Sequence, residues 1–271
     1  MIRLVLVGAS GRMGQGILQL LPEFPELRLT GVVVSERHLA RVRQQLATQP
    51  GAEGALCDTS LAAVLTKGAD LVIDFSVASA TRATLQACVR ARVPLLLGTT
   101  GLDEETRQRL DAAAPAIALL VAANTSLGVN LLIELVRQAA AALPVQFDIE
   151  IIESHHRSKL DAPSGTALAL GAAAAEGREV ELKAVALTSR QPASTPRPAG
   201  QIGFAVVRGG DVVGEHQVQF LGVGERLQLA HSATDRAVFA RGALVAGLWL
   251  ASRPPGRYGM ADVFRKGAIK Q

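Results

Sequence analysis

The chain has 271 residues, of which 49% are hydrophobic and only 3% aromatic, and its formal net charge is +4. This length predicts about two domains, with cores built mostly from Ala, Val and Leu. The scarcity of aromatic side chains argues against a surface that stacks nucleic-acid bases. No apolar stretch approaches the ~18 residues that a membrane-spanning helix needs.

The two cysteines, Cys57 and Cys88, form neither a CxxC pair nor a metal-ligand spacing. We interpret both as reduced packing residues, which is typical of a cytoplasmic protein. Residues 1–7 are too few, and too soon followed by glycines, for a signal peptide. The basic excess contains no run of like charges, so it indicates a solvated surface, with a local preference for small anions as the alternative.

Short apolar runs alternate with helical patterns through the first 125 residues. Strands are expected at residues 2–7, 29–34, 71–75, 93–97 and 117–122. Helices are expected at residues 15–21, 40–46, 60–65, 80–91 and 104–114. Such alternation predicts a parallel sheet with helices on both faces, which is the Rossmann-like, doubly wound α/β class.

The pattern changes after residue 123. A long helix is expected at 130–143, a strand at 147–153, a helix from about 165, strands at 202–207, 212–220 and 227–231, and a last helix from about 235. Residues 208–211 and 222–225 carry hairpin-turn signals. The second region is therefore predicted to be α+β with a mixed or antiparallel sheet. Residues 190–200 contain three prolines and are expected to form a loop.

A glycine-rich segment separates the first expected strand from the first helix: Gly8-Ala9-Ser10-Gly11-Arg12-Met13-Gly14. Glycines allow a tight turn and a close approach of the backbone to a pyrophosphate, which the N–H groups of the helix N-terminus then bind. The GxxGxxG spacing alone is weak, and a glycine turn without a ligand is the alternative. Its position at the start of the alternating pattern favours a dinucleotide site.

Two further loops follow expected parallel strands. They are Gly98-Thr99-Thr100-Gly101 and Ala122-Ala123-Asn124-Thr125. Ligands of such sheets bind at the carboxyl ends of the strands, so both loops are expected to border the same crevice. An ordinary turn or helix cap is the alternative for each threonine taken singly.

The end of the second strand bears on the choice of cofactor. An NAD-selective site usually has an acidic residue about 20 positions beyond the glycine loop, but Val34 and Ser35 stand there. Arg12 and Arg37 could bind a 2′-phosphate, although solvated surface arginines are the alternative. Glu36 keeps the use of NADH possible. We expect NADPH to serve at least as well as NADH.

A basic loop follows the strand expected at 147–153. His155, His156, Arg157 and Lys159 fall within five positions, and Ser164-Gly165-Thr166 then opens an Ala- and Leu-rich helix. Cations beside a helix N-terminus form a site suited to a small dicarboxylate. A solvated basic turn with a serine cap is the alternative. A metal site is less favoured, because adjacent histidines on an extended chain point to opposite faces. His38, His216 and His231 are interpreted as surface or structural residues.

The chain resembles the dihydrodipicolinate reductases nearly from end to end. The resemblance is carried by residues 8–14, 74–76, 98–101, 122–124, 150–159, 161–167, 203–204, 208–216 and 225–227. The His-His-Arg-x-Lys-x-Asp-Ala-Pro-Ser-Gly-Thr stretch, residues 155–166, is its most specific part.

This resemblance implies an NADH- or NADPH-dependent reductase of lysine and diaminopimelate biosynthesis. It implies a homotetramer built through the second sheet, with residues 1–125 and 236–271 as the dinucleotide-binding domain and 126–235 as the substrate-binding and oligomerisation domain. His155 matches the family's proton donor and acceptor, Lys159 matches its proton donor, and His156, Gly165 and Thr166 match substrate-binding positions, to which Arg157 adds positive charge. Another two-domain dehydrogenase, such as an amino-acid dehydrogenase, and a non-enzymatic NADPH sensor are the rival interpretations.

Overall fold

The computed structural model describes residues 1–190 and 196–264. The chain divides into two compact units, Met1–Leu127 with Ala237–Gln271, and Gly128–Arg236. Part of the loop expected at residues 190–200, and the last seven residues of the expected first domain, lie outside the described residues. Within the described part of the chain, no helix has the length and apolar character needed to cross a membrane.

The first unit contains a sheet of seven parallel strands in the order β12-β6-β5-β4-β1-β2-β3. The strands are β1 (Ile2–Val7), β2 (Leu27–Val33), β3 (Leu56–Asp58), β4 (Leu71–Asp74), β5 (Leu95–Leu97), β6 (Ala118–Val121) and β12 (Gly256–Tyr258). The five strands expected from the sequence are confirmed. Strands β3 and β12 were not expected, because their sequences, Leu-Cys-Asp and Gly-Arg-Tyr, contain no run of apolar residues.

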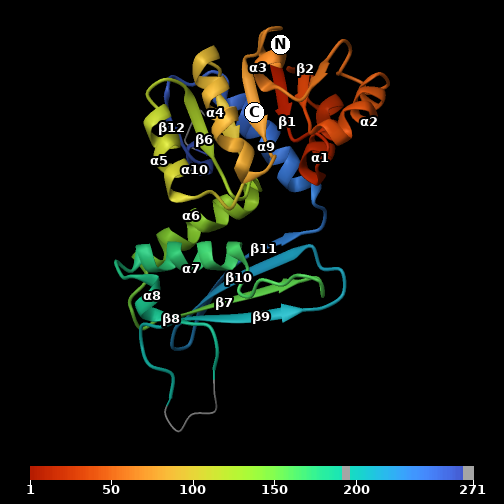
Figure 1. The fold of residues 1–271 in the computed structure, drawn as a ribbon. Coiled ribbons are helices and arrows are strands. Elements are labelled where there is room, and N and C mark those ends of the chain that lie inside the picture. The colour runs from red at the N-terminus through yellow and green to blue at the C-terminus, as the bar shows by residue number, and fades with distance from the viewer. Residues whose placement is uncertain (191–195, 265–271) are drawn as a thin grey trace. The chain divides into compact units, whose positions relative to one another are not determined.

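Helices cover both faces of this sheet, as the alternating pattern predicts (Figure 1). The even-numbered residues Leu4 and Leu6 of β1 pack with α1 (Arg12–Leu20), α2 (Glu36–Leu46) and α9 (Ala237–Leu250). The odd-numbered Val5 and Val7 pack with α3 (Leu61–Leu65), α4 (Ala78–Ala91) and α5 (Glu104–Ala113). The short segments η1 (Leu21–Glu23) and α10 (Met260–Val263) complete the unit. Successive side chains of a strand point to opposite faces, so one strand supplies both cores.

Strand β1 lies where the order of the strands reverses, because the chain continues to β2 on one side and returns to β4 on the other. In open α/β sheets, this reversal point is where the carboxyl ends of the strands bind ligands. The glycine segment follows β1 directly. The topology therefore places the glycines at the carboxyl end of β1, at this reversal point.

The second unit is a five-stranded mixed sheet in the order β11-β10-β7-β9-β8. Its strands are β7 (Asp148–His155), β8 (Ala186–Leu187), β9 (Ile202–Arg208), β10 (Gly214–Leu221) and β11 (Arg226–Ala233). Helices α6 (Leu127–Ala142) and α7 (Gly165–Gly177) pack on one face, over a core that includes Ile149, Ile151 and Phe220; α8 (Leu182–Val185) follows α7 (Figure 1). The mixed α+β unit expected from the sequence is confirmed.

One of the two predicted hairpins is wrong. Strands β10 and β11 do form a hairpin, closed by a hydrogen bond from Gly222 N to Glu225 O. Strands β9 and β10 are not neighbours, because β7 lies between them, parallel to β9 and antiparallel to β10. The connecting segment, residues 209–213, passes around the end of β7 and bonds to it: Gly209 N donates to His155 O, and His156 N donates to Val212 O. Turn residues alone do not distinguish this crossing from a hairpin.

Candidate active site

The glycine turn of the first unit is built so that side chains are excluded from it. Gly8 has a φ of +84°, which favours glycine, and a Cβ there would lie 2.6 Å from the carbonyl oxygen of Phe75. A Cβ on Gly14 would lie 2.4 Å from Gly8 O. Helix α1 begins at Arg12 with Gly11 as its N-cap. The first N–H groups of a helix lack intrahelical partners, so this turn suits a pyrophosphate.

Within this turn the predicted cofactor residues differ in exposure. Ala9 is buried beneath the turn, whereas Ser10 and Met13 are half-buried, and Gly11 and Arg12 are exposed. Ala9 therefore contributes packing and backbone atoms, and the exposed members are the ones whose atoms a ligand can reach.

A buried carboxyl group connects two of the predicted loops. Asp74, at the end of β4, is fully buried, and its Oδ1 accepts a hydrogen bond of 2.7 Å from Ser76 N and a long one of 3.5 Å from Thr99 Oγ1. Burial raises the pKa of Asp74, although these hydrogen bonds act to lower it. The ring of Phe75 packs where Gly98 has no side chain, since a Cβ there would lie 2.0 Å from the ring. The turn after β4 thus touches both Gly8 and the Gly98 loop.

The third predicted loop is also at the carboxyl edge of the sheet, after β6. Ala122 and Thr125 are buried, and Thr125 Oγ1 donates a 2.7 Å hydrogen bond to Phe239 O of α9. Asn124 Oδ1 accepts a 2.9 Å bond from Ser126 N, which shapes the turn. Thr125 is therefore a structural member of the loop, whereas Ala123 and, at the Gly98 loop, Thr100 are exposed.

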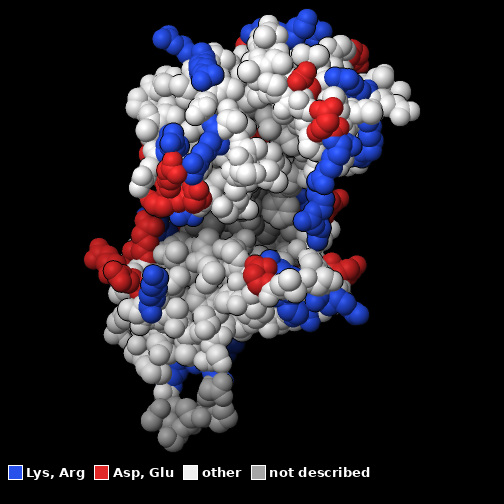
Figure 2. All heavy atoms as spheres, viewed as in Figure 1, with Lys and Arg blue, Asp and Glu red and all other residues white. Residues whose placement is uncertain are grey.

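The residues predicted to determine the preference between NADPH and NADH lie on the surface. Ser35 is the N-cap position of α2, and its hydroxyl contacts His38 Nδ1 at 3.1 Å. Arg12 and Arg37 are exposed, and neither guanidinium forms an ion pair with a described carboxylate. On the face that Figure 2 shows, acidic and basic side chains are interspersed.

The basic loop of the second unit begins where β7 ends. His155 is its last residue and is 8% exposed, whereas His156 is half-buried, and Arg157 is exposed. Lys159 Nζ forms an ion pair with both carboxylate oxygens of Asp161, at 2.8 and 2.9 Å. Arg236 donates to His156 Nε2 at 3.3 Å. The histidines therefore differ: His155 is packed and fixed, and His156 lies nearer the surface among cations.

A buried carboxylate beneath the loop was missed by the sequence reasoning. Glu153 is 1% exposed, and its Oε2 lies 2.5 Å from His155 Nδ1. Arg208 donates to both of its oxygens, at 2.7 and 2.8 Å, and Ser164 N donates to Oε1 at 3.0 Å. Burial would raise the pKa of Glu153, but the hydrogen bonds from Arg208, His155 and Ser164 hold it below its usual value. Glu153 is therefore a carboxylate at neutral pH.

His216 completes the support of His155 from the neighbouring strand. The two rings meet edge to face, with centroids 5.1 Å apart, and His216 Nε2 lies 3.0 Å from Ser164 Oγ. Burial lowers the pKa of His216 to about 4, so this ring is neutral at physiological pH. Burial also lowers the pKa of His155, and the hydrogen bond with Glu153 opposes that shift. Glu153 precedes His155 by two residues, so both side chains lie on the same face of β7. This spacing is the feature of the sequence from which the Glu153–His155 pair could have been predicted.

The N-terminus of α7 lies next to this cluster. Ser164 is the N-cap, and its Oγ accepts a hydrogen bond of 3.1 Å from Ala167 N. Gly165 is exposed with open space around it, and Thr166 is half-buried in the first turn. The positive end of the helix dipole and Lys159 make this part of the unit suitable for an anion. Among the described residues, no group of three or more His, Cys, Asp or Glu has a metal-binding arrangement.

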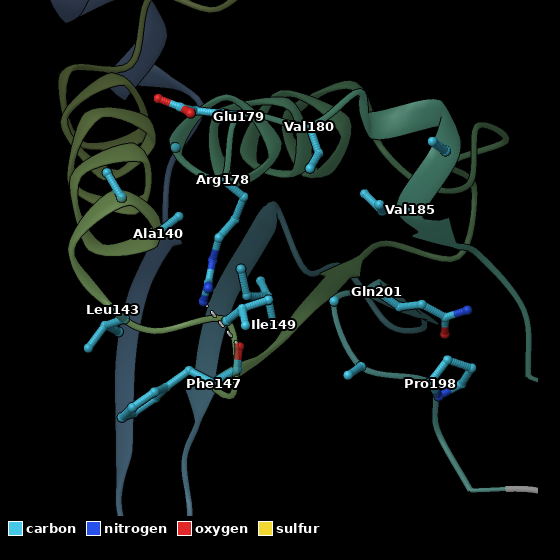
Figure 3. A pocket seen from close by; sticks show the side chains of 16 residues that line it. Ala140, Leu143, Phe147, Ile149, Arg178, Glu179, Val180, Val185, Pro198 and Gln201 are labelled. Carbon is cyan, nitrogen blue, oxygen red and sulfur yellow. Dashed lines mark hydrogen bonds between the residues drawn. The ribbon is translucent and has the colours of Figure 1, made fainter.

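The second unit also contains a cavity of about 740 Å³ that shares no residue with the predicted site (Figure 3). Leu143, Phe147, Ile149 and Val185 form the apolar part of its lining, and polar residues including Glu179 and Gln201 line the rest. Arg178, at the end of α7, extends into it and donates to Phe147 O at 3.2 Å. The cavity lies beside the carboxyl end of α7, whereas the predicted site uses the amino end.

A Rossmann-like unit with a glycine turn at its reversal point, in one chain with a unit that bears a histidine–lysine loop, defines a nicotinamide-dependent oxidoreductase. The family models described as dihydrodipicolinate reductase, N-terminus, and dihydrodipicolinate reductase, C-terminus, match residues 2–125 and 128–264. The chain belongs to the dihydrodipicolinate reductase family.

Individual relatives agree with the family models. The chain is 46% identical over 263 residues to a 4-hydroxy-tetrahydrodipicolinate reductase of Zymomonas mobilis, covering 97% of this chain and 96% of the relative. It is 47% identical over 261 residues to the reductase of that name in a Ruegeria species, covering 96% and 97%. A dipicolinate-bound dihydrodipicolinate reductase structure from Paenisporosarcina superposes with a TM-score of 0.78 at 24% identity, covering 96% of this chain and 97% of that one, which supports the fold.

Proposed function

We propose that this chain is an NADPH- or NADH-dependent reductase that converts 4-hydroxy-tetrahydrodipicolinate to tetrahydrodipicolinate in lysine and diaminopimelate biosynthesis. The observation that carries the proposal is relatedness at about 46% identity along nearly the whole chain to reductases of that name. The structure also supports this activity, because the histidine–lysine loop is present and its His155 is hydrogen-bonded to the buried Glu153.

The first unit, taken as residues 1–125 with 236–271, would bind the cofactor. The pyrophosphate would lie on the turn formed by Gly8, Ala9, Ser10, Gly11, Arg12 and Met13, because a backbone free of side chains there lets phosphate oxygens approach. The nicotinamide would lie near Gly98, Thr99, Thr100, Ala122, Ala123, Asn124 and Thr125. Ser35, Arg37 and Arg12 would surround the adenosine 2′ position. When bound, the cofactor supplies a hydride.

The second unit, residues 126–235, would bind the substrate. One carboxylate of the dicarboxylate would accept hydrogen bonds at the N-terminus of α7 from Gly165 and Thr166, and His156 and Arg157 would add positive charge. His155 would hold and move a proton at Nε2, because Nδ1 is engaged by Glu153. Lys159 would donate a proton from Nζ after leaving Asp161. Protonation must accompany reduction of a conjugated imine, and these two groups supply it.

The open face of the second sheet supports a homotetramer. The face opposite α6 and α7 presents Ile152, Ala205, Val207, Gln217 and Gln219, with Val207 52% exposed. A face that pairs glutamines with aliphatic side chains suits burial against a second copy. We place the enzyme in the cytoplasm, as expected for a biosynthetic reductase with two free, buried cysteines.

The decisive experiment is turnover of substrate generated in situ by the preceding synthase, followed as loss of NADPH absorbance. We expect oxidation of NADPH that depends on both the synthase and this chain. Binding of NADPH without turnover would instead indicate a sensor. Oxidation of NADPH with a keto acid and ammonia, or reduction of NADP+ by an amino acid, in the absence of turnover of the synthase product, would indicate another dehydrogenase. A separate measurement of mass in solution tests the tetramer.

A further inference from the structure

The carboxylate of Glu153 receives four hydrogen-bonding groups in a buried position. Nη1 and Nη2 of Arg208 and Ser164 N donate to it, and the fourth contact is His155 Nδ1. All the partners but His155 can only donate. An ionised carboxylate can only accept, so Nδ1 of His155 must carry the proton in this contact.

The arrangement also fixes the ring in space. His155 packs edge-on against His216. Its backbone is also held, because His155 O accepts a hydrogen bond from Gly209 N and the next residue, His156, donates its N–H to Val212 O. A Cβ on Gly214 would come within 3.0 Å of His155 Nε2, so the glycine leaves room at that nitrogen. Nε2 has no hydrogen-bond partner among the described residues. It is the ring atom left to exchange a proton with a substrate.

We propose that Glu153, kept ionised by Arg208, is a positioning residue that holds His155 as the Nδ1–H tautomer and presents Nε2 for proton transfer. The kinetic consequence of this inference rests on the proposed reductase activity. The tautomer rests on the contacts alone. A carboxylate that orients a histidine in this way also stabilises the imidazolium, as in the serine-protease triad. Among the described residues, the charged or titratable groups near His155 include Glu153, Arg208 and Lys159, and His216 contacts its ring.

Glu153→Gln is the informative change because it preserves shape and reverses hydrogen-bonding polarity at one atom. The amide oxygen would occupy the Oε1 position, where both Arg208 and Ser164 donate. The amide nitrogen would then take the place of Oε2, where it would donate to His155 Nδ1 and remove the acceptor of the hydrogen bond from Arg208 Nη1. Neutral His155 would be driven to the Nε2–H tautomer, and its pKa would fall because the carboxylate no longer stabilises the imidazolium.

The matched control is Glu150→Gln. Glu150 lies on the same strand, on the opposite face, and is likewise paired with arginine, through Arg197 Nε at 3.0 Å and Arg190. It makes no contact with His155. Both variants remove one carboxylate from an arginine pair of β7, so a general loss of strand stability would affect both.

The first measurement needs no activity. Wild-type protein labelled with ¹⁵N-histidine is examined by long-range ¹H–¹⁵N correlation, with His155→Gln assigning the signal. We expect neutral His155 to be the Nδ1–H tautomer in the wild type and in Glu150→Gln, and the Nε2–H tautomer in Glu153→Gln. An Nε2–H tautomer in the wild type overturns the proposal, whether or not the Glu153 variant folds.

The second measurement is kinetic. Loss of the group that orients a functional histidine costs about 10- to 100-fold at metal sites and about 10⁴-fold in the serine-protease triad. We therefore expect kcat of Glu153→Gln to fall at least tenfold, cofactor Kd to stay unchanged, and the alkaline limb of kcat/KM, which requires protonated His155, to move to lower pH. An unchanged limb and kcat would overturn the inference. Absence of turnover in the wild type would defeat the reductase and leave the tautomer result standing.

Discussion

Gly214, the first residue of β10, lies beside the ring of His155, the last residue of β7, and the glycine has no side chain where the histidine presents Nε2. A Cβ at Gly214 would lie 3.0 Å from Nε2 and 3.3 Å from Cδ2. This distance is shorter than ordinary van der Waals contact, so the imidazole would have to move by a few tenths of an ångström.

Gly214→Ala is therefore expected to lower kcat by about tenfold while leaving cofactor affinity unchanged, since small displacements of a reacting group are costly. Steady-state kinetics and titration of NADPH fluorescence measure the two quantities. Gly209→Ala is the control, because a Cβ there meets nothing within 4 Å. Equal kcat values for the two variants would contradict the proposed crowding.

Lys159→Met should reduce kcat about 10²- to 10⁴-fold, because that is the usual contribution of a positioned proton donor. Cofactor Kd should remain near wild type, because Lys159 belongs to the other unit from the glycine turn. Lys183→Met, an exposed lysine of α8 in the same unit, is the control. Near-normal turnover in Lys159→Met would remove the lysine from the chemistry.

Thr166→Val should raise KM for the substrate more than it lowers kcat. Valine keeps the shape of threonine and removes its hydroxyl, and loss of an interaction shared by ground and transition states appears in KM. Initial rates over a range of substrate concentration distinguish the two effects. If KM were unchanged, the carboxylate site would have to be sought elsewhere than the start of α7.

NADPH should be used at least as well as NADH, and Arg12→Ala should lower kcat/KM more for NADPH than for NADH. The reason is that a guanidinium at the glycine turn can pair with the 2′-phosphate that only NADPH carries. Arg41→Ala, farther along α2, is the control. A tenfold preference of the wild type for NADH, or an equal loss for both cofactors, would contradict this assignment.

The buried His216 should make stability depend on pH. Its pKa is lowered from 6.5 to about 4 in the folded protein, so between these values the unfolded chain binds more protons and stability falls as pH falls. A shift of this size corresponds to about 3 kcal/mol. The free energy of unfolding, measured by thermal unfolding at fixed protein concentration, should depend less steeply on pH between 6.5 and 4 in His216→Asn than in the wild type. The pH dependence should be unchanged in His38→Asn. An unchanged slope in His216→Asn would disprove it.

Much of the first unit could be predicted from the sequence because its strands are buried on both faces and its glycines mark a strand–helix turn. The serine cap is an example: Ser60 does accept a hydrogen bond from Ala63 N at the start of α3. Strands β3 and β12 could not be predicted, because neither contains a run of apolar residues, and only their pairing with β2 and β6 shows that they are strands.

The histidine–lysine loop was found from its composition, but its support was not. Glu153 and His216 are brought together by the pairing of β7 with β10, in which they are direct partners. Arg208 reaches the same carboxylate from β9. Neighbours across a sheet are set by the order and register of the strands, and the residues of one strand do not by themselves identify the strand beside it.

The crossing of residues 209–213 around the end of β7 makes this segment unlike an ordinary surface turn. Such turns commonly tolerate extra residues, and the β10–β11 hairpin at 222–225 should do so. Three backbone hydrogen bonds join the 209–213 segment to residues 155–157, and their donors are the N–H groups of Gly209, His156 and Arg157. A single inserted residue would shift those bonds out of phase and displace His155, so chain length in this segment should be under stricter selection than the identity of its exposed side chains.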